Sequence, residues 1–136
     1  MTASTAQATD TDVVRAVFQA FANADTAMLG ELMHPGATWD HRNDDRLGGI
    51  HQGSDAIMAY LARSAQLTGG TLRAVPQSFL ADGQGRVCVL VQVSGTRPDG
   101  RSFSNPQLVL LTLDSGRVRS IDQFVGDPAA VAAFWA

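Results

Sequence analysis

The chain has 136 residues and a net charge of −3, and hydrophobic residues make up 45% of it against 17% charged residues. This length and composition fit one globular domain with a single core, and they exclude an intrinsically disordered chain. No apolar run approaches the roughly 20 residues that span a bilayer, and no basic cluster offers a nucleic-acid surface. The N-terminal residues lack a signal-peptide pattern and Cys88 has no partner cysteine, so we expect a cytoplasmic protein without disulfides.

The first elements in chain order are a tail and two helices. Residues 1–10 are small and polar, which predicts a disordered tail, and residues 11–136 form the expected domain. From Thr11 onward apolar residues recur at helical spacing, and they are Val14, Val17, Phe18 and Phe21. A second short helix, capped by Asp25 and carrying apolar residues as far as Met33, must end before Pro35.

A short strand, "ATWDH" at 37–41, leads into a polar loop and then a third helix. Ser54 is the predicted N-cap of that helix, and Gly69-Gly70 ends it. Four β runs follow, separated by the turn sequences "DGQG", "RPDG" and "DSG", and they cover 71–81, 86–96, 102–113 and 117–125. Asp127-Pro128 then starts a final helix through Trp135. The order α-α-β-α-β-β-β-β-α predicts an α+β fold with a curled antiparallel sheet.

The first strand carries the leading candidate for acid–base chemistry. Side chains alternate along a strand, so His41 shares a face with Trp39 while Asp40 points the opposite way. If Trp39 is buried, His41 faces the interior with it, where an imidazole can exchange protons near neutral pH. The alternative is a rim histidine bonded to the loop. The following residues 42–46 alternate in charge, which is typical of a solvated segment.

The last strand carries apolar residues on both faces. Regular alternation places Val118, Ser120, Asp122 and Phe124 on one face and Gln123 among residues of the other. One face toward a pocket and the other toward a partner subunit would explain this pattern, so we expect a homodimer. Asp122 is the only sheet aspartate that could supply a carboxylate to the pocket.

Four amides lie within the predicted strands, where apolar residues are easier to bury: Gln92, Asn105, Gln107 and Gln123. They either bind ligand oxygens in a neutral pocket or make hydrogen bonds at an edge or dimer interface. Tyr60 has a core position from which its hydroxyl could reach a cavity. His51 lies in a glycine-flanked turn. It is predicted to be either a surface histidine or a further residue of the pocket. Cys88 is predicted to be inert core.

The element order, the segment "LGGIHQGSDAIMAYL", the exit "LTGGTL" and the ending "SGRV…FVGDPAAVAAFWA" resemble SnoaL-like proteins of the nuclear transport factor 2-like superfamily. The resemblance covers residues 11–136 and implies a conical α+β barrel, with a pocket between the concave sheet face and the helices. It also implies pairing through the outer sheet face. In ketosteroid isomerases of this superfamily a catalytic Asp follows a similar segment, close to the position of His41.

The superfamily contains enzymes and binding proteins. The resemblance and the pocket candidates together predict an acid–base cyclisation or isomerisation of a hydrophobic, oxygenated, polyketide-like metabolite. No cofactor or metal is expected. The alternative is a dimeric protein that binds such a ligand without turnover. Epoxide hydrolysis is disfavoured, because the acid positions of the related hydrolases fall on Gln92 and Gln123.

Overall fold

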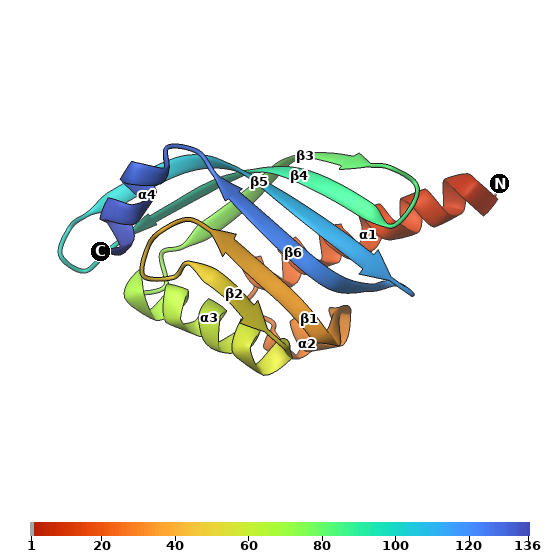
Figure 1. The fold of residues 1–136 in the computed structure, drawn as a ribbon, viewed down its shortest axis with the longest axis horizontal. Coiled ribbons are helices and arrows are strands. Elements are labelled where there is room, and N and C mark those ends of the chain that lie inside the picture. Colours follow the sequence, from red (N-terminus) through yellow and green to blue (C-terminus); the bar gives the residue numbers. More distant parts are fainter. Residues whose placement is uncertain (1) are drawn as a thin grey trace.

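Four helices cover one side of a six-stranded sheet in the computed structural model (Figure 1). The structure describes the backbone of residues 2–136 and the side chains of residues 10–136. The helices are α1 (Thr2–Ala22), α2 (Thr26–Leu32), α3 (Ser54–Leu67) and α4 (Pro128–Trp135). The predicted disordered tail lies almost wholly outside the described side chains, and its disorder stays a prediction.

The sheet has the strand order β2-β1-β6-β5-β4-β3 and is open at both edges. Its strands are β1 (Met33–Arg42), β2 (Gly49–Gln52), β3 (Arg73–Ala81), β4 (Arg86–Thr96), β5 (Ser102–Asp114) and β6 (Arg117–Val125). The α+β fold and the antiparallel meander from β3 to β6 are confirmed. The prediction of an entirely antiparallel sheet is wrong, because β1 and β6 pair in parallel.

Two local predictions around β1 are also corrected. Met33 does not lie on the second helix: α2 ends at Leu32, and β1 begins at Met33 and runs through Pro35. The chain then turns back after Arg42 and forms β2, an antiparallel partner of β1 that the sequence analysis does not contain. This hairpin encloses the segment 43–48, in which Asp44 and Arg46 are exposed as predicted, while Leu47 and the side chain of Asp45 are buried.

The curved sheet packs its inner face against the helices to form the core. Val91, Val109 and Ile121 are buried there on three neighbouring strands. Val118 is buried with them, although regular alternation places it on the Phe124 face. The pairing shifts by one residue between Thr112 and Leu113, and this bulge reverses the alternation in β6.

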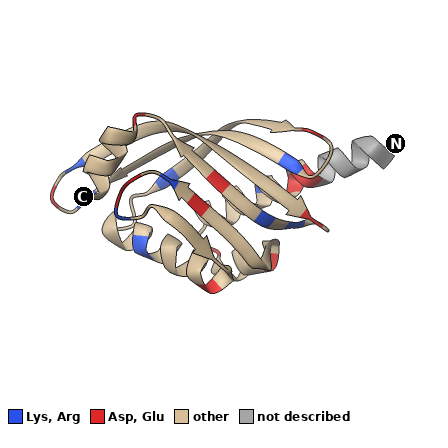
Figure 2. Ribbon diagram, in the orientation of Figure 1, with Lys and Arg blue, Asp and Glu red and all other residues tan. Residues whose placement is uncertain are grey.

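Cys88 lies on the outer face of β4 and is partly exposed, so the prediction that it belongs to the core is wrong. The same outer face carries charged residues next to one another on β1 and β6 (Figure 2). No helix of the described chain has the length and apolar character needed to cross a membrane.

At the other end of the chain, Asp127 caps α4 as predicted, since its side chain accepts a hydrogen bond from the Ala130 backbone N–H. The helix brings Phe134 and Trp135 against Phe103 of β5, with the rings of Phe103 and Phe134 stacked 4.1 Å apart. Trp135 thereby becomes part of the wall of the interior cavity described next.

Candidate functional site

An apolar cavity of about 80 Å³ lies between the concave face of the sheet and the helices. Val17 and Phe18 of α1, Leu61 of α3 and residues of the central strands supply most of its wall. Its polar wall residues are Trp39, His41, Tyr60, Ser64, Gln107 and Gln123. All except Ser64 belong to one hydrogen-bonded network, so the cavity has one polar end in an otherwise apolar enclosure.

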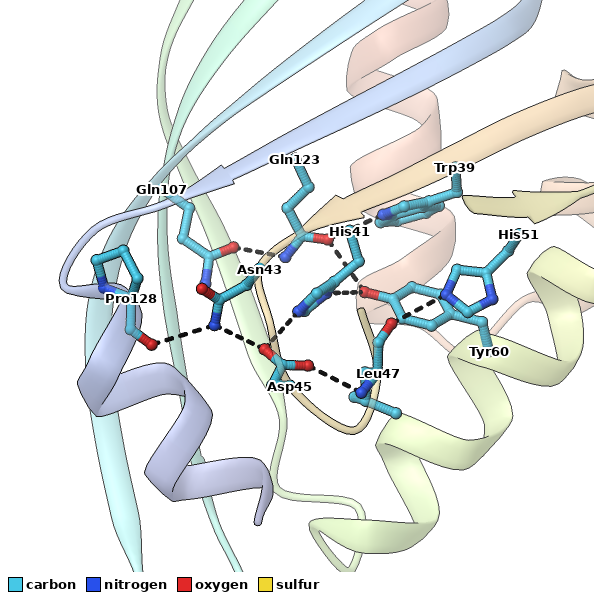
Figure 3. Close-up of polar contacts among 10 residues, drawn as sticks. All are labelled: Trp39, His41, Asn43, Asp45, Leu47, His51, Tyr60, Gln107, Gln123 and Pro128. Carbon is cyan, nitrogen blue, oxygen red and sulfur yellow. Dashed lines mark hydrogen bonds and ion pairs between the residues drawn. The ribbon is translucent and has the colours of Figure 1, made fainter. Parts of the chain in front are cut away.

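His41 stands at the centre of that network (Figure 3). Its side chain is 2% exposed, so the prediction that it faces the interior with Trp39 is confirmed. Nδ1 lies 2.8 Å from the Tyr60 hydroxyl and Nε2 lies 2.9 Å from Oδ2 of Asp45. Both ring nitrogens are therefore engaged, one toward the cavity wall and one toward the loop after β1.

Asp45 reaches His41 because the loop after β1 folds back on itself. Backbone hydrogen bonds join Asn43 N–H to His41 C=O and Gly48 N–H to Asp45 C=O. The fully buried carboxylate accepts three hydrogen bonds, from the His41 ring, from Asn43 Nδ2 at 2.7 Å and from the Leu47 N–H at 2.8 Å. Asn43 Nδ2 also donates to the Pro128 C=O, which ties the loop to the start of α4.

These contacts decide the charge of Asp45. Burial by itself raises the pKa of this carboxyl, but the hydrogen bonds from His41 and Asn43, the attraction to His41 and the Leu47 N–H together outweigh burial and hold the pKa below its ordinary value. Asp45 is therefore an anion at neutral pH. An anion can only accept, so Nε2 of His41 carries a proton and donates it to Asp45.

Tyr60 connects His41 to the amides of the sheet. Burial, assisted by the negative charge of Asp45, raises the pKa of Tyr60 well above its ordinary value, so the phenol stays protonated. Its oxygen lies 2.8 Å from His41 Nδ1 and 3.0 Å from Oε1 of Gln123. One hydroxyl proton cannot serve both, so both are hydrogen bonds only when Nδ1 donates to Tyr60 and Tyr60 donates to Gln123. The network is satisfied in full by a doubly protonated His41.

The two glutamine amides have defined orientations. Trp39 Nε1, which can only donate, lies 2.9 Å from Oε1 of Gln123 and so identifies that atom as the oxygen. Gln123 Nε2 then donates to Oε1 of Gln107 at 2.7 Å. This leaves Nε2 of Gln107, a residue of the cavity wall, as a donor without an acceptor among the described residues.

The remaining predicted site residues lie outside the cavity wall. His51 stacks on Tyr60 with ring centres 4.2 Å apart and contacts the Leu47 C=O through Nε2, so it supports the tyrosine from behind. Asn105 shares the buried face of Gln107, as predicted, but its Nδ2 donates to the Gly126 C=O near the strand end.

Two predicted site residues lie on the wrong side of the sheet. Asp122 pairs with Arg42 at 2.9 Å on the outer face, so it cannot supply a carboxylate to the cavity. Gln92 also lies on the outer face, where it donates to Ser104 Oγ. In both cases the neighbouring inward position is taken by another residue, Gln123 on β6 and Val91 on β4.

Asp45 is the functional candidate that the sequence analysis missed. The alternating charges of residues 42–46 predict a solvated segment, whereas the side chain of Asp45 is 0% exposed. The signal that could have revealed it is Gly48-Gly49. A Cβ at Gly48 would collide with the Asn43 C=O, which shows how tightly the loop closes around Asp45. Within the described residues, no group of three or more His, Cys, Asp or Glu side chains is placed to hold a metal ion.

Comparison with known proteins agrees with this architecture. Residues 14–121 match the SnoaL-like domain. An uncharacterized protein of Mycobacterium tuberculosis, Rv0034, is 30% identical over 127 residues, which cover 93% of this chain and 96% of the relative. The structure of Bal32a, from a soil-derived mobile gene cassette, superposes with a TM-score of 0.93 at 28% identity and covers 96% of this chain and 99% of that one.

A more distant solved structure has the same fold. It is a putative SnoaL-like polyketide cyclase from Jannaschia, with a TM-score of 0.78 at 21% identity, covering 96% of this chain and 94% of that one. A nuclear transport factor 2-like protein from Burkholderia xenovorans superposes with a TM-score of 0.82 at 22% identity, over 96% of this chain and 98% of the other. The match to the domain covers most of the sequence, and the chain therefore belongs to the SnoaL-like family within the nuclear transport factor 2-like fold.

Proposed function

We propose that the protein is an acid–base enzyme that removes and returns a proton next to a carbonyl group of an uncharged, polyketide-like small molecule. Such a step is the core of an aldol-type cyclisation or of an isomerisation. The observation that carries this proposal is the Asp45–His41–Tyr60 chain at the polar end of an apolar cavity. A buried ionisable pair in a cavity is a common signature of catalysis.

The hydrogen-bond geometry supports one route for the proton. The route starts from neutral His41 and not from the doubly protonated form: Nε2–H remains on Asp45, and the free Nδ1 accepts a hydrogen bond from the Tyr60 hydroxyl, which then no longer donates to Gln123. The Tyr60 oxygen then takes the proton of the ligand as it gives its own to Nδ1. This exchange forms no free phenolate, which the raised pKa of Tyr60 disfavours. The ligand becomes a negatively charged enolate. The positive charge gained by His41 is balanced by the negative charge of Asp45.

Gln107 supplies the second requirement of this chemistry. A developing enolate oxygen needs a donor that is already in place and is not used by the protein. Nε2 of Gln107 meets that description, because Gln123 holds the other end of its amide. The described cavity wall contains no Arg, Lys, Asp or Glu, which favours a neutral ligand.

Hydrogen–deuterium exchange tests the proposal without knowledge of the substrate. The probe is 2-tetralone, an apolar ketone, in D₂O, and NMR follows the loss of its α-hydrogens. We expect wild-type protein to accelerate exchange and His41→Gln to remove the acceleration. Glutamine is preferred to alanine here because His41 is buried, and truncating a buried side chain destabilises the fold.

A specific observation favours a second candidate, the binding protein without turnover. Both ring nitrogens of His41 already have partners within the protein, so the network can be purely structural. In that case 2-tetralone binds, but its exchange in the presence of protein equals that in buffer. An epoxide hydrolase-like activity receives no support, since Gln92 lies on the outer face and Gln123 is an amide.

We also propose that the protein forms a homodimer through the outer face of the sheet. Leu90, Leu108 and Phe124 lie opposite one another on β4, β5 and β6, and they are 39%, 46% and 44% exposed. A row of this kind is typical of an interaction surface. Sedimentation should show a dimer at micromolar concentration that Leu108→Arg converts to monomer; a wild-type monomer would contradict the proposal.

A further inference from the structure

The cavity does not end at its apolar wall. A groove of about 520 Å³ lies between the end of α1, the start of α2, α3 and β3. Five residues line both the groove and the cavity, and they are Phe21, Leu29, Leu61, Leu72 and Ala74. Because these side chains face both spaces, the cavity and the groove adjoin at these five residues, which we call the neck.

The polar groups are distributed unevenly along this path. All five residues of the neck are apolar. None of the residues of the hydrogen-bonded network, from Trp39 to Gln123, lines the groove. The path thus runs from a polar inner end, through an apolar neck, to a groove whose polar residues, such as Asn23 and Arg73, are on the outside.

The two spaces also differ in size. The cavity of about 80 Å³ has room for a small part of a ligand, since one water molecule needs roughly 10–15 Å³ by the same measure. The groove is several times larger and is apolar over much of its wall, with Met58, Ala62 and Ala65 of α3 on one side. A ligand confined to the cavity would leave this surface uncovered.

We propose that the groove binds the apolar tail of the same ligand whose oxygenated head occupies the cavity. The ligand class is therefore an elongated ketone or related carbonyl compound with an alkyl or aryl-alkyl tail. This inference rests on the proposed function for the position of the head group. It differs from it by assigning ligand length to residues that take no part in proton transfer.

A series of methyl ketones measures the length of the binding path: 2-butanone, 2-hexanone, 2-octanone and 2-decanone. Both tryptophans of the chain, Trp39 and Trp135, line the cavity, so their fluorescence reports binding of each probe. Each methylene that is buried should lower Kd roughly fourfold. We expect the decrease to continue up to the longest ketones in wild-type protein.

Two substitutions on α3 separate the groove from the cavity. Ala62 is exposed and lines the groove, whereas Ala59 is exposed on the same helix and lines neither space. Ala62→Phe should leave the Kd of 2-butanone unchanged and abolish the gain with chain length. Ala59→Phe should behave as wild type. Ala65→Phe, also in the groove, repeats the test if Ala62→Phe fails to fold.

Three results would overturn the inference. The first is a Kd that stops falling at the same chain length in wild type and in Ala62→Phe. The second is an Ala59→Phe variant with the same effect as Ala62→Phe. The third is a failure of every ketone in the series to bind. Failure of the proposed function is read separately. Suppose that long ketones bind more tightly through the groove but 2-tetralone does not exchange its α-hydrogens. The groove inference is then supported, and the proposed acid–base catalysis is rejected.

Discussion

Two ion pairs on neighbouring residues of β1 have the same length and different surroundings. His41 and Asp45 are 2.9 Å apart with side chains 2% and 0% exposed, and Arg42 and Asp122 are 2.9 Å apart with side chains 49% and 24% exposed. The pleat of β1 directs His41 to the cavity and Arg42 to the outer face, where its guanidinium also lies over Phe124. Distance alone therefore does not distinguish the two pairs.

Burial makes the chemical difference between the two pairs. Water screens the outer pair, whose members are free to separate, so it contributes little to stability and cannot hold a proton in place. The inner pair is enclosed and hydrogen-bonded at His41 and at Asp45, and the negative charge of Asp45 adds to the effect of burial in raising the pKa of Tyr60. Both faces of the sheet carry a pair of an acidic and a basic side chain. Only the His41–Asp45 pair is shielded from water, and this burial marks it as the candidate site.

The largest expected effect comes from removing the Tyr60 hydroxyl, which is the cavity end of the Asp45–His41–Tyr60 hydrogen-bond network. Tyr60→Phe keeps the ring that packs between Trp39 and His51 but removes the hydroxyl that contacts His41 Nδ1 and that, in the proposed route, takes the ligand proton. We expect exchange of the 2-tetralone α-hydrogens to slow by roughly 10²–10⁴, the usual contribution of general acid–base catalysis. NMR in D₂O provides the rate.

Asp122→Asn is the matched control for this experiment, because it neutralises an aspartate of the outer pair and leaves the cavity intact. Its exchange rate should equal that of wild type. An equal loss in both variants would mean that the comparison between the two pairs has no bearing on activity.

The next effect is on stability. Asp45→Ala leaves His41, Asn43 and the Leu47 N–H without their common acceptor in a buried place. We expect the free energy of unfolding to fall by about 3 kcal/mol, the low end of the range for a broken buried pair, because Asp45 belongs to a surface loop. Urea denaturation monitored by tryptophan fluorescence measures the change. Asp122→Ala, on the exposed pair, should leave the midpoint almost where it is.

The lowered pKa of Asp45 gives this prediction a pH dependence. A carboxyl with a lower pKa in the folded state stabilises the fold fully above its ordinary value of 3.8, and that contribution is lost as the pH falls through the lowered value. Wild-type stability should therefore decline below about pH 4 more steeply than that of Asp45→Ala. Parallel profiles for the two proteins would show that Asp45 is not held as an anion.

The sequence predicts much of the fold and part of the site, for identifiable reasons. The meander follows from alternation and from turns such as "RPDG", and two strands, 86–96 and 117–125, have the predicted ends. β2 is missed because "GIHQ" is short and carries no clear alternation. The parallel pairing of β1 with β6 joins residues about 80 positions apart, and a local pattern contains no such information.

The site shows the same division. Alternation places His41 beside Trp39, but it leaves open whether Asp122 or Gln123 faces the cavity, and only the structure places Gln123 there. Alternation cannot place Asp45, because a loop has no regular period. Its carboxylate is turned inward by the hydrogen bonds around Asn43. Sequence patterns thus find residues on regular elements and miss a loop residue whose burial depends on closure of the chain.

The smallest expected effect extends the comparison of the two sheet faces from ion pairs to neutral amides. Gln107→Leu removes the donor that has no protein partner, while Gln123 retains Trp39 and Tyr60 as donors to its oxygen. Loss of one neutral hydrogen bond to a ligand oxygen costs roughly 0.5–1.5 kcal/mol, which corresponds to a roughly two- to twelvefold higher Kd for 2-tetralone. Titration of tryptophan fluorescence gives that constant.

Gln92→Leu, which changes an outer-face amide bonded to Ser104, is the matched control and should bind as wild type does. If both variants bind like wild type, the ligand oxygen does not lie at Gln107, and the enolate must be stabilised by Tyr60 alone.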